Sequence, residues 1–337
     1  MIGSGGDSPW RGVHFENGRF FNPGAPRQRF VQFARWITRR EQGSWSSFTA
    51  REPGSPPPER VRGNDLRVTF VNHSTFLLQT AGLNVLTDPV WSERVSPVTF
   101  AGPRRRRAPG LRMEDLPPID AILISHNHYD HFDTATLARL LERNRPAVFC
   151  PLGLARPLGQ IGFAEIRELD WWQNTTWRGL RIYCVPAQHF SARTPFDRNR
   201  TLWCGWMLDN EEGSIYFAGD TGFGSLFEEI GSSFPRIRLS LLPIGAYKPQ
   251  WFMGPIHMAP SHALYAHRIL NSRYSIATHF GTFPLADDGE AEPVLGLVRA
   301  LQMEPPSNPF VVLQEGNSAD IPQLERFSEE CTATSAP

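Results

Sequence analysis

The stretch AILISHNHYDH, residues 121–131, decides how this sequence is interpreted. Its first four residues are apolar and predict a short buried strand. Three histidines and an aspartate then fall within residues 126–131, although the whole chain has only 10 histidines in 337 residues. A strand buries its body and exposes its end, so we expect these side chains to share one space at the strand terminus. His126 and His128 are two positions apart and point to the same side of an extended chain.

Imidazole and carboxylate groups in this pattern favour zinc, iron or manganese over calcium or magnesium. His126 and His128 form one pair of donors, while Asp130 and His131, where the chain turns, form a second pair. One loop can therefore serve two metal ions. Asp133 stands where its side chain can cap the N-terminus of the helix that follows.

Three further candidates each come directly after a strand-like run: His189, Asp220 and His279. Taken alone, a residue of this kind is more often an ordinary loop or core residue than a ligand. Their shared position, just past a strand and beside small residues, favours a common role. Together with the 126–131 loop they complete a seven-donor site for two metal ions.

Strand-like runs alternate with helical patterns from Leu66 to about Glu315 and predict an α/β domain with two sheets or one large one. The first run, 66–80, is separated from 83–86 by Ala81-Gly82 and predicts a hairpin. The other predicted strands are 121–124, 147–149, 181–185, 201–208, 214–218, 239–244, 274–278 and 310–313. The predicted helices are 134–144, 262–270 and 292–303.

Residues 10–45 mix aromatic side chains with arginines, and the Pro-rich stretch 51–65 is typical of a linker. Within the first of these, 30–39 predicts an amphipathic helix, whose apolar face is Phe30, Phe33, Ala34 and Ile37 at helical spacing. Such a helix packs on the protein's own core or lies on a membrane surface, and both interpretations stay open. The last ten residues are polar without periodicity, which is typical of disorder.

Composition excludes several classes of protein. Lys plus Arg is 34 and Asp plus Glu is 34, so no basic excess points to nucleic acid. No window holds 18 consecutive apolar residues, and the N-terminus lacks the pattern of a secretory signal. We therefore expect a cytoplasmic protein, with peripheral membrane contact as a further option. Its 4 cysteines are expected to be reduced and to serve in packing.

The sequence resembles the metallo-β-lactamase superfamily. Residues 126–131 match its HxHxDH motif, and the later His, Asp and His arrive in its order. Within the superfamily the sequence is similar to the N-acylphosphatidylethanolamine-hydrolysing phospholipase D family and its bacterial relatives. The segments that carry this similarity are 86–89, 101–104, 126–131, 217–222, 251–253 and 279–283.

The resemblance implies an α/β fold, an αββα sandwich with two metals at one edge. It places an arm and linker at 1–65, a hydrolase domain at 66–315 and a tail at 316–337. The first metal would be held by His126, His128 and His189, and the second by Asp130, His131 and His279, with Asp220 bridging both.

The resemblance also implies residues around the metals. Asp88 would hold the other N–H of a ligating imidazole. Tyr129 and His257 would contact the substrate. One departure is visible, because Ile256 stands before His257 where the animal enzymes carry glutamine.

The implied activity is hydrolysis of a phosphodiester, as in phospholipase D, with N-acylphosphatidylethanolamine or a related phospholipid as substrate. Two zinc ions, or iron or manganese in their place, would activate a water molecule. Asp130, Asp220 and His257 would be the catalytic residues, and no GxSxG motif offers a serine nucleophile. A metal-dependent lactonase or esterase and a non-hydrolytic redox or binding module remain alternatives, because the metal site alone does not choose among them.

Two groups of side chains fit a lipid substrate or ordinary packing equally well. The first would line a channel for acyl chains and comprises Phe223, Tyr247, Trp251, Phe252 and Met253. The second, Arg104 to Arg107, would meet a phosphate headgroup or form a solvated turn. The expected partner is a phospholipid or another small molecule, without nucleic acid, and the oligomeric state stays open, a homodimer included.

Overall fold

The computed structural model describes residues 8–23, 25 and 30–324, and two seven-stranded sheets form the centre of this part of the chain. The first sheet consists, in spatial order, of β16 (Ser318–Asp320), β3 (Leu66–Asn72), β4 (Thr75–Thr80), β5 (Leu83–Thr87), β6 (Ala121–Leu123), β7 (Ala147–Pro151) and β8 (Ile166–Leu169). The second consists of β15 (Phe310–Val311), β14 (Ser275–Thr278), β13 (Ile237–Pro243), β12 (Ser214–Phe217), β11 (Gly205–Asp209), β10 (Leu180–Val185) and β9 (Asn174–Trp177). A separate pair in the N-terminal arm is formed by β1 (Phe15–Glu16) and β2 (Arg19–Phe20).

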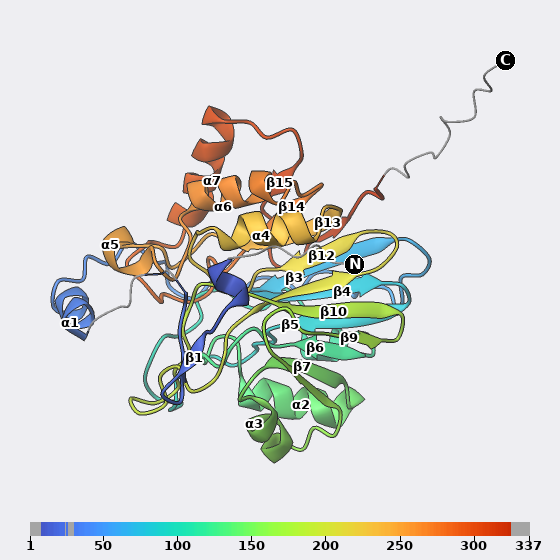
Figure 1. Cartoon of the computed structure of the whole chain (residues 1–337), viewed down its shortest axis with the longest axis horizontal. Helices are drawn as coiled ribbons and strands as arrows, with labels where there is room; N and C mark the ends of the chain where they lie inside the picture. Colours follow the sequence, from blue (N-terminus) through green and yellow to red (C-terminus); the bar gives the residue numbers. More distant parts are fainter. Residues whose placement is uncertain (1–7, 24, 26–29, 325–337) are drawn as a thin grey trace.

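Helices cover the outer face of each sheet, which gives the αββα sandwich that the sequence predicts (Figure 1). On the first sheet, Leu137 and Leu158 from two helices join one buried apolar cluster with Ile122 of β6. The helices of the first sheet are α2 (Thr134–Asn144) and α3 (Ala155–Ile161), and those of the second are α4 (Leu226–Ser233), α6 (Pro260–Ile269) and α7 (Glu292–Met303). Shorter or peripheral helices are η1 (Pro9–Arg11), α1 (Phe30–Thr38), η2 (Met113–Asp115) and α5 (Gln250–Met253).

Strand direction explains why polar side chains gather at one edge of the sandwich. Strands β5 to β8 pair in parallel, and so do β12 to β15. Strand β10 runs in the direction of β12, because both are antiparallel to β11 between them. The carboxyl ends of the parallel strands in each sheet therefore share an edge, and the residues after β6 meet those after β10, β12 and β14 there.

Three predicted helices are confirmed, two of them (134–144 and 292–303) at the predicted bounds. Asp133 caps α2, because its side chain accepts a hydrogen bond from the Thr136 N–H. The prediction of one strand over 66–80 was wrong. Strand β3 ends and β4 begins around His73, whose backbone is left-handed with φ of 49°, a conformation that breaks a strand.

The structure extends the first sheet beyond the predicted end of the domain, since β16 pairs with β3. The last ten residues, predicted to be disordered, lie outside the described part of the chain. The predicted linker 51–65 has no helix or strand, but it is held to the first sheet. Gln79 donates to the Pro58 carbonyl at 2.7 Å, and Asn84 donates to the Glu59 carbonyl at 3.0 Å.

The arm contains α1, the amphipathic helix that the sequence predicts, but the buried side of the helix is not the predicted apolar face. Trp36 is 8% exposed, whereas Phe33 and Ile37 of the predicted apolar face are 44% and 47% exposed. The helix packs through Trp36, whose ring stacks on Phe252 of α5 at a centroid distance of 5.2 Å. Within residues 8–23, 25 and 30–324, no helix has both the length and the apolar character needed to cross a membrane.

Candidate metal centre

One buried cluster collects side chains from the ends of several strands. Strand β6 leads into the 126–131 loop, while β10, β12 and β14 lead to His189, Asp220 and His279. All seven ligands that the sequence predicts come together at this point. Six of them are buried, and His128 is half-buried.

His126, His128 and His189 form what we call the first ligand set. His128 Nδ1 lies 2.7 Å from His126 Nε2 and 3.2 Å from His189 Nε2. The second ring nitrogen of His189 and that of His126 each have a partner of their own. His189 Nδ1–H donates to the Ile256 carbonyl at 2.9 Å, and His126 Nδ1 lies 2.8 Å from Ser125 Oγ. These contacts direct the Nε2 lone pairs of His126 and His189 into the shared space.

The first ligand set is neutral in this environment. Burial lowers the pKa of His128 to about 4 and lowers the pKa of His126 and of His189 well below the usual value. A neutral imidazole has a free lone pair, which is the form that coordinates a metal. The set is therefore prepared for a cation at neutral pH without losing a proton.

Asp130, His131 and His279 form the second ligand set. The Nε2 atoms of His131 and His279 lie 3.2 and 3.4 Å from Asp130 Oδ2. They lie 3.2 and 3.0 Å from Asp220 Oδ2. Burial opposes charge at this point, but the facing carboxylates raise the pKa of His279 to about 9 and that of His131 well above its usual value.

The two carboxyl groups respond in the opposite direction. Burial alone would raise the pKa of Asp130 and of Asp220, but the imidazole of His131 and its neighbours lower both well below the usual range. The second ligand set and Asp220 therefore form a buried ion-paired group in the metal-free chain.

Asp220 lies between the two sets. Its Oδ2 is 3.9 Å from His126 Nε2 and 3.7 Å from His189 Nε2, in addition to its shorter distances to the second set. Gly219 allows this close approach, because a Cβ at that position would lie 2.7 Å from the side chain of Ser125. One carboxylate thus faces imidazoles of both sets, as a ligand shared by two ions must.

The cluster fits a metal ion. Among the residues that the structure describes, the buried atoms here without a hydrogen-bond partner include Asp220 Oδ1, His131 Nε2, His279 Nε2 and His257 Nδ1. Buried polar atoms without partners are costly and call for an explanation. Imidazole and carboxylate are the donors that zinc, iron and manganese prefer. The cluster is therefore able to bind metal.

Asp88, at the end of β5, lies behind the second set as the resemblance implies. Its Oδ2 accepts hydrogen bonds from His131 Nδ1–H at 2.6 Å and from the Ser125 hydroxyl at 2.5 Å, and its Oδ1 accepts from the Ser125 N–H at 2.7 Å. The contact fixes the tautomer of His131 with Nε2 toward the cluster. Asp88 also has a left-handed backbone with φ of 32°, the kind of strain that accumulates at functional sites.

His73 belongs to the cluster, although it is not among the predicted site residues. It lies in the β3–β4 turn, with Nε2 2.9 Å from Asp130 Oδ2 and its carbonyl accepting from the His279 N–H at 2.8 Å. Burial lowers the pKa of His73 to about 3, so its neutral ring donates a hydrogen bond through Nε2–H to the Asp130 carboxylate. The available signal was the polar Asn72-His73-Ser74, which interrupts an apolar run.

A family model for the beta-lactamase superfamily domain matches residues 83–280, more than half of the chain. The chain belongs to this superfamily. The N-acyl-phosphatidylethanolamine-hydrolyzing phospholipase D 1 of Caenorhabditis elegans is 39% identical over 232 residues, 65% of either chain. The mitochondrial N-acyl-phosphatidylethanolamine-hydrolyzing phospholipase D of Saccharomyces cerevisiae is 34% identical over 219 residues, 63% of this chain and 47% of the yeast protein.

Solved structures agree on the fold. Igni18, a metallo hydrolase from Ignicoccus hospitalis, superposes with a TM-score of 0.59 at 22% identity, covering 77% of this chain and 99% of Igni18. The chain spans less than two thirds of the length of the worm and yeast relatives. The predicted superfamily and its αββα fold are confirmed. The curated relatives are named as hydrolases, in line with the prediction of a metal-dependent hydrolase.

A cavity of about 640 Å³ opens onto the metal centre of this superfamily member. Its polar lining includes His128, Asp130, Asp220, His257 and His279. Its apolar lining includes Phe33, Trp36, Phe190, Phe252, Met253, Ile256 and Leu285. Apolar walls around a few convergent polar groups are the usual form of a site for a small amphipathic ligand.

The residues predicted to contact substrate divide into two groups. His257 lines the cavity, and its Nδ1 lies 4.0 Å from Asp220 Oδ2. Phe252 and Met253 also line it. The other three predicted channel residues do not belong to this lining: Trp251 is 46% exposed, Phe223 stacks on Phe227 of α4, and Tyr247 is buried elsewhere.

Tyr129 and two of the four consecutive arginines make structural contacts. The Tyr129 hydroxyl donates to the Arg193 carbonyl at 2.9 Å, and the Arg193 guanidinium lies 3.9 Å from the centre of its ring. Arg105 is buried and donates to backbone carbonyls, and Arg107 pairs with Glu290 at 2.8 Å. These contacts favour a packed turn for that arginine run over a headgroup site.

Proposed function

We propose that this chain is a dinuclear zinc-dependent phosphodiesterase with phospholipase D-like action on N-acylphosphatidylethanolamine or a related phospholipid. The observation that carries the proposal is the juxtaposition of the two ligand sets with an apolar cavity of about 640 Å³. A lipid phosphodiester matches both features, because its anionic phosphate fits the two ligand sets and its apolar acyl chains fit the cavity.

In this proposal the first ligand set holds one zinc ion, the second set holds the other, and Asp220 contacts both. Bound there, two divalent cations would supply Lewis acidity that lowers the pKa of a water molecule to near 7 and neutralises a phosphate oxygen. Zinc suits these donors, because a mixed histidine and aspartate site is typical of it. Iron or manganese would fit the same donors.

His257 is proposed to orient the leaving group. Burial lowers the pKa of its imidazole to about 3, so the ring is neutral and donates a hydrogen bond rather than acting as a cationic acid. It lines the cavity beside Asp220, where a leaving oxygen of the substrate would lie. Asp130 would hold the second ligand set in place during the same step, and its Oδ2 is itself bonded to His73 Nε2 at 2.9 Å.

The substrate class rests on the relatives and on the cavity together. The worm and yeast relatives are N-acyl-phosphatidylethanolamine-hydrolyzing phospholipases D. In this chain, Phe33, Trp36 and Phe252 would contact acyl chains, because they form part of the apolar lining. Phe33 and Ile37 are about half exposed on α1, which fits peripheral contact with a lipid surface.

The test is product analysis with zinc-loaded protein and vesicles that contain N-acylphosphatidylethanolamine. We expect phosphatidic acid and N-acylethanolamine in equal amounts, loss of both after chelation, and recovery after zinc is returned. A panel of lactones and carboxylic esters tests the competing esterase function. Hydrolysis of that panel without cleavage of any phosphodiester would overturn the proposal, and iron-dependent oxygen consumption without hydrolysis would replace it with a redox function.

A further inference from the structure

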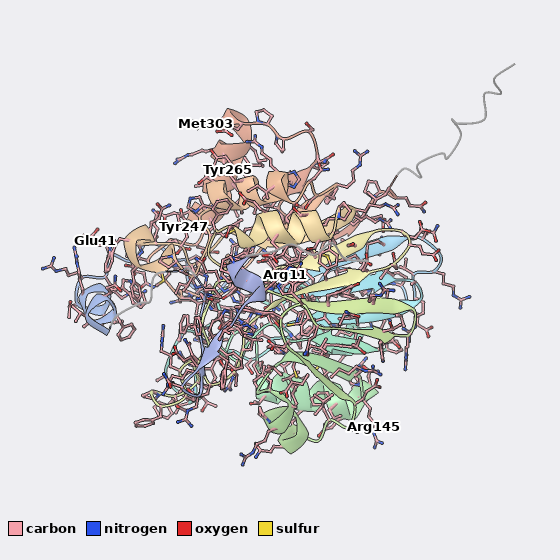
Figure 2. The ribbon with its side chains drawn as sticks, in the orientation of Figure 1. Arg11, Glu41, Arg145, Tyr247, Tyr265 and Met303 are labelled. Carbon is pink, nitrogen blue, oxygen red and sulfur yellow. The ribbon has the colours of Figure 1, made fainter. Side chains whose placement is uncertain are left out.

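The N-terminal arm lies against the loop that carries His189, although it precedes the part of the chain that the family model matches. In Figure 1 the arm, in dark blue, crosses the front of the sandwich from η1 to β1. Arg11, labelled in Figure 2, lies over the body of the molecule and pairs with Glu229 of α4 at 2.5 Å. Two asparagines, one in the arm and one in the loop, connect the arm to residues 189–199.

The first of these, Asn22, contacts both backbone groups of His189. Its Nδ2–H donates to the His189 carbonyl at 2.7 Å, and its Oδ1 accepts from the His189 N–H at 3.3 Å. The same Oδ1 accepts from the Trp203 indole N–H at 3.0 Å. A side-chain amide is suited to this task because it has a donor and an acceptor side by side, as a neighbouring strand would.

The second asparagine strengthens the docking. Asn199 donates through Nδ2 to the Phe20 carbonyl at 3.1 Å and accepts the Phe20 N–H through its own carbonyl at 2.8 Å. The Asn199 N–H in turn donates to the Ser191 carbonyl at 2.7 Å. The arm is therefore bonded to the loop after β10 at two points, at His189 through Asn22 and at Asn199 through Phe20.

We propose that Asn22 is a positioning residue for the ligand His189, so that the arm completes the first ligand set. This inference rests on the proposed function, in which His189 coordinates a metal. The His189 ring is fixed at Nδ1 by the Ile256 carbonyl, and Asn22 fixes the backbone from which the ring extends. These two contacts leave the Nε2 lone pair of His189 available to coordinate a metal ion, and they restrict its position relative to His126 and His128.

The experiment measures zinc binding by metal-free protein in competition with a chelator of known affinity. Asn22→Asp has nearly the same shape but places a carboxylate oxygen against the His189 carbonyl, and Asn22→Ala removes both bonds. We expect each to weaken one of two zinc-binding steps roughly 10- to 100-fold, the usual loss when the partner of a ligand is removed, and to leave the other step unchanged. With excess zinc, kcat should return toward the wild-type value while KM stays constant.

Two further variants make the result specific. His189→Ala should abolish the same step that Asn22→Asp weakens. His14→Ala removes an arm contact to Asp170, away from the ligand loop, and both steps should keep wild-type affinity. Thermal unfolding of each metal-free variant, compared with wild type, checks that the chain is folded.

The two ideas fail in different ways. If His189→Ala loses a zinc step while Asn22→Asp and Asn22→Ala bind both ions with wild-type affinity, the positioning role of Asn22 is wrong and the ligand assignment stands. If His189→Ala itself binds both ions as tightly as wild type, the ligand assignment is overturned, and the role of Asn22 with it.

Discussion

The two ligand sets of the metal centre are adjacent, yet burial acts on them differently. In the first set, burial lowers the pKa of every imidazole, and His128 is brought to about 4. In the second set, burial is outweighed by the facing carboxylates, which raise the pKa of His279 to about 9. The first set is thus a neutral donor group, whereas the second is a buried ion-paired group that must lose protons before it can coordinate a metal.

The sets also differ in what holds them. The first is supported from outside the sandwich, by Asn22 of the arm and by the carbonyl of Ile256. The second is supported from inside, by His73 in the β3–β4 turn and by Asp88 at the end of β5. A buried support is closed to solvent and shared with the core, so we expect the second set to be the more rigid of the two.

The largest effect is expected at Asp220, the residue common to both sets. Asp220→Asn keeps the shape but removes the charge that faces imidazoles of both sets. Loss of a partner of a metal ligand typically costs roughly 10- to 100-fold in metal affinity or activity, so loss of a ligand shared by both ions should lower activity by at least roughly a hundredfold. We expect loss of metal from both sets in elemental analysis. Asp209→Asn, at the opposite end of the second sheet, is the control, and equal behaviour of the two variants would refute the shared role.

The convergence of the seven predicted ligands was predictable, because histidine is scarce in this chain and the candidates lie just past strand-like runs. His73 was not, since the short polar break Asn72-His73-Ser74 is too weak a signal for a turn inside a run that resembled one strand. Its position depends on a left-handed backbone at φ of 49°, which the sequence does not specify. The role of Asn22 could not be predicted either, because its partner His189 is 167 positions away and only tertiary packing brings them together.

The next effect concerns pH and separates the two sets. Because the pKa of His279 is raised to about 9, its proton is bound at pH 7 in the metal-free chain and must leave when a metal binds. Zinc affinity of the second set should therefore rise with pH, by up to about tenfold per unit for each proton released, until about pH 9. The pKa of His128 is about 4, so the first set should show no such rise between pH 6 and 9.

Zinc titrations at pH 6, 7 and 8, with proton release measured in buffers of different ionisation enthalpy, check this prediction. One binding step should release protons and the other should release none. Two steps with the same pH dependence would mean that the two sets do not differ in their charge.

In the fold too, some helices and strands are predicted by the residue pattern, whereas others depend on tertiary packing. Helices α2 and α7 were predicted at their observed bounds because their apolar residues recur at helical spacing. Strands β8 and β9 were missed, since 166–169 and 174–177 are rich in polar residues and only half-buried. In α1 the helix was predicted but its buried face was not, because Trp36 packs on Phe252 in place of the apolar stripe that includes Phe33.

A third prediction tests the inner support of the second set. His73→Asn can adopt the left-handed backbone of the turn, as asparagine does more readily than most residues, but its side chain is too short to reach Asp130. We expect roughly a 10- to 100-fold loss of metal affinity in the second set, with the first set unchanged. His267→Asn, a buried histidine bonded to Ser275 on the far side of the second sheet, is the control for loss of a buried imidazole. It should lower thermal stability without changing metal affinity.

The smallest effect is expected in the arm at His14, whose Nε2 pairs with Asp170 at 2.7 Å. Burial opposes the charged ring, but the hydrogen bond to Asp170 raises the pKa of His14 above 6.5. The stabilising contribution is therefore complete below about pH 6.5 and is lost as the pH rises through the folded-state value. His14→Ala should reduce the free energy of unfolding by no more than about 1 kcal/mol, and more at pH 5.5 than at pH 8.5. Denaturant titrations of wild type and variant at both pH values measure the difference, and an equal loss at pH 5.5 and 8.5 would show that packing on Trp171, at a centroid distance of 4.4 Å, dominates over the ion pair.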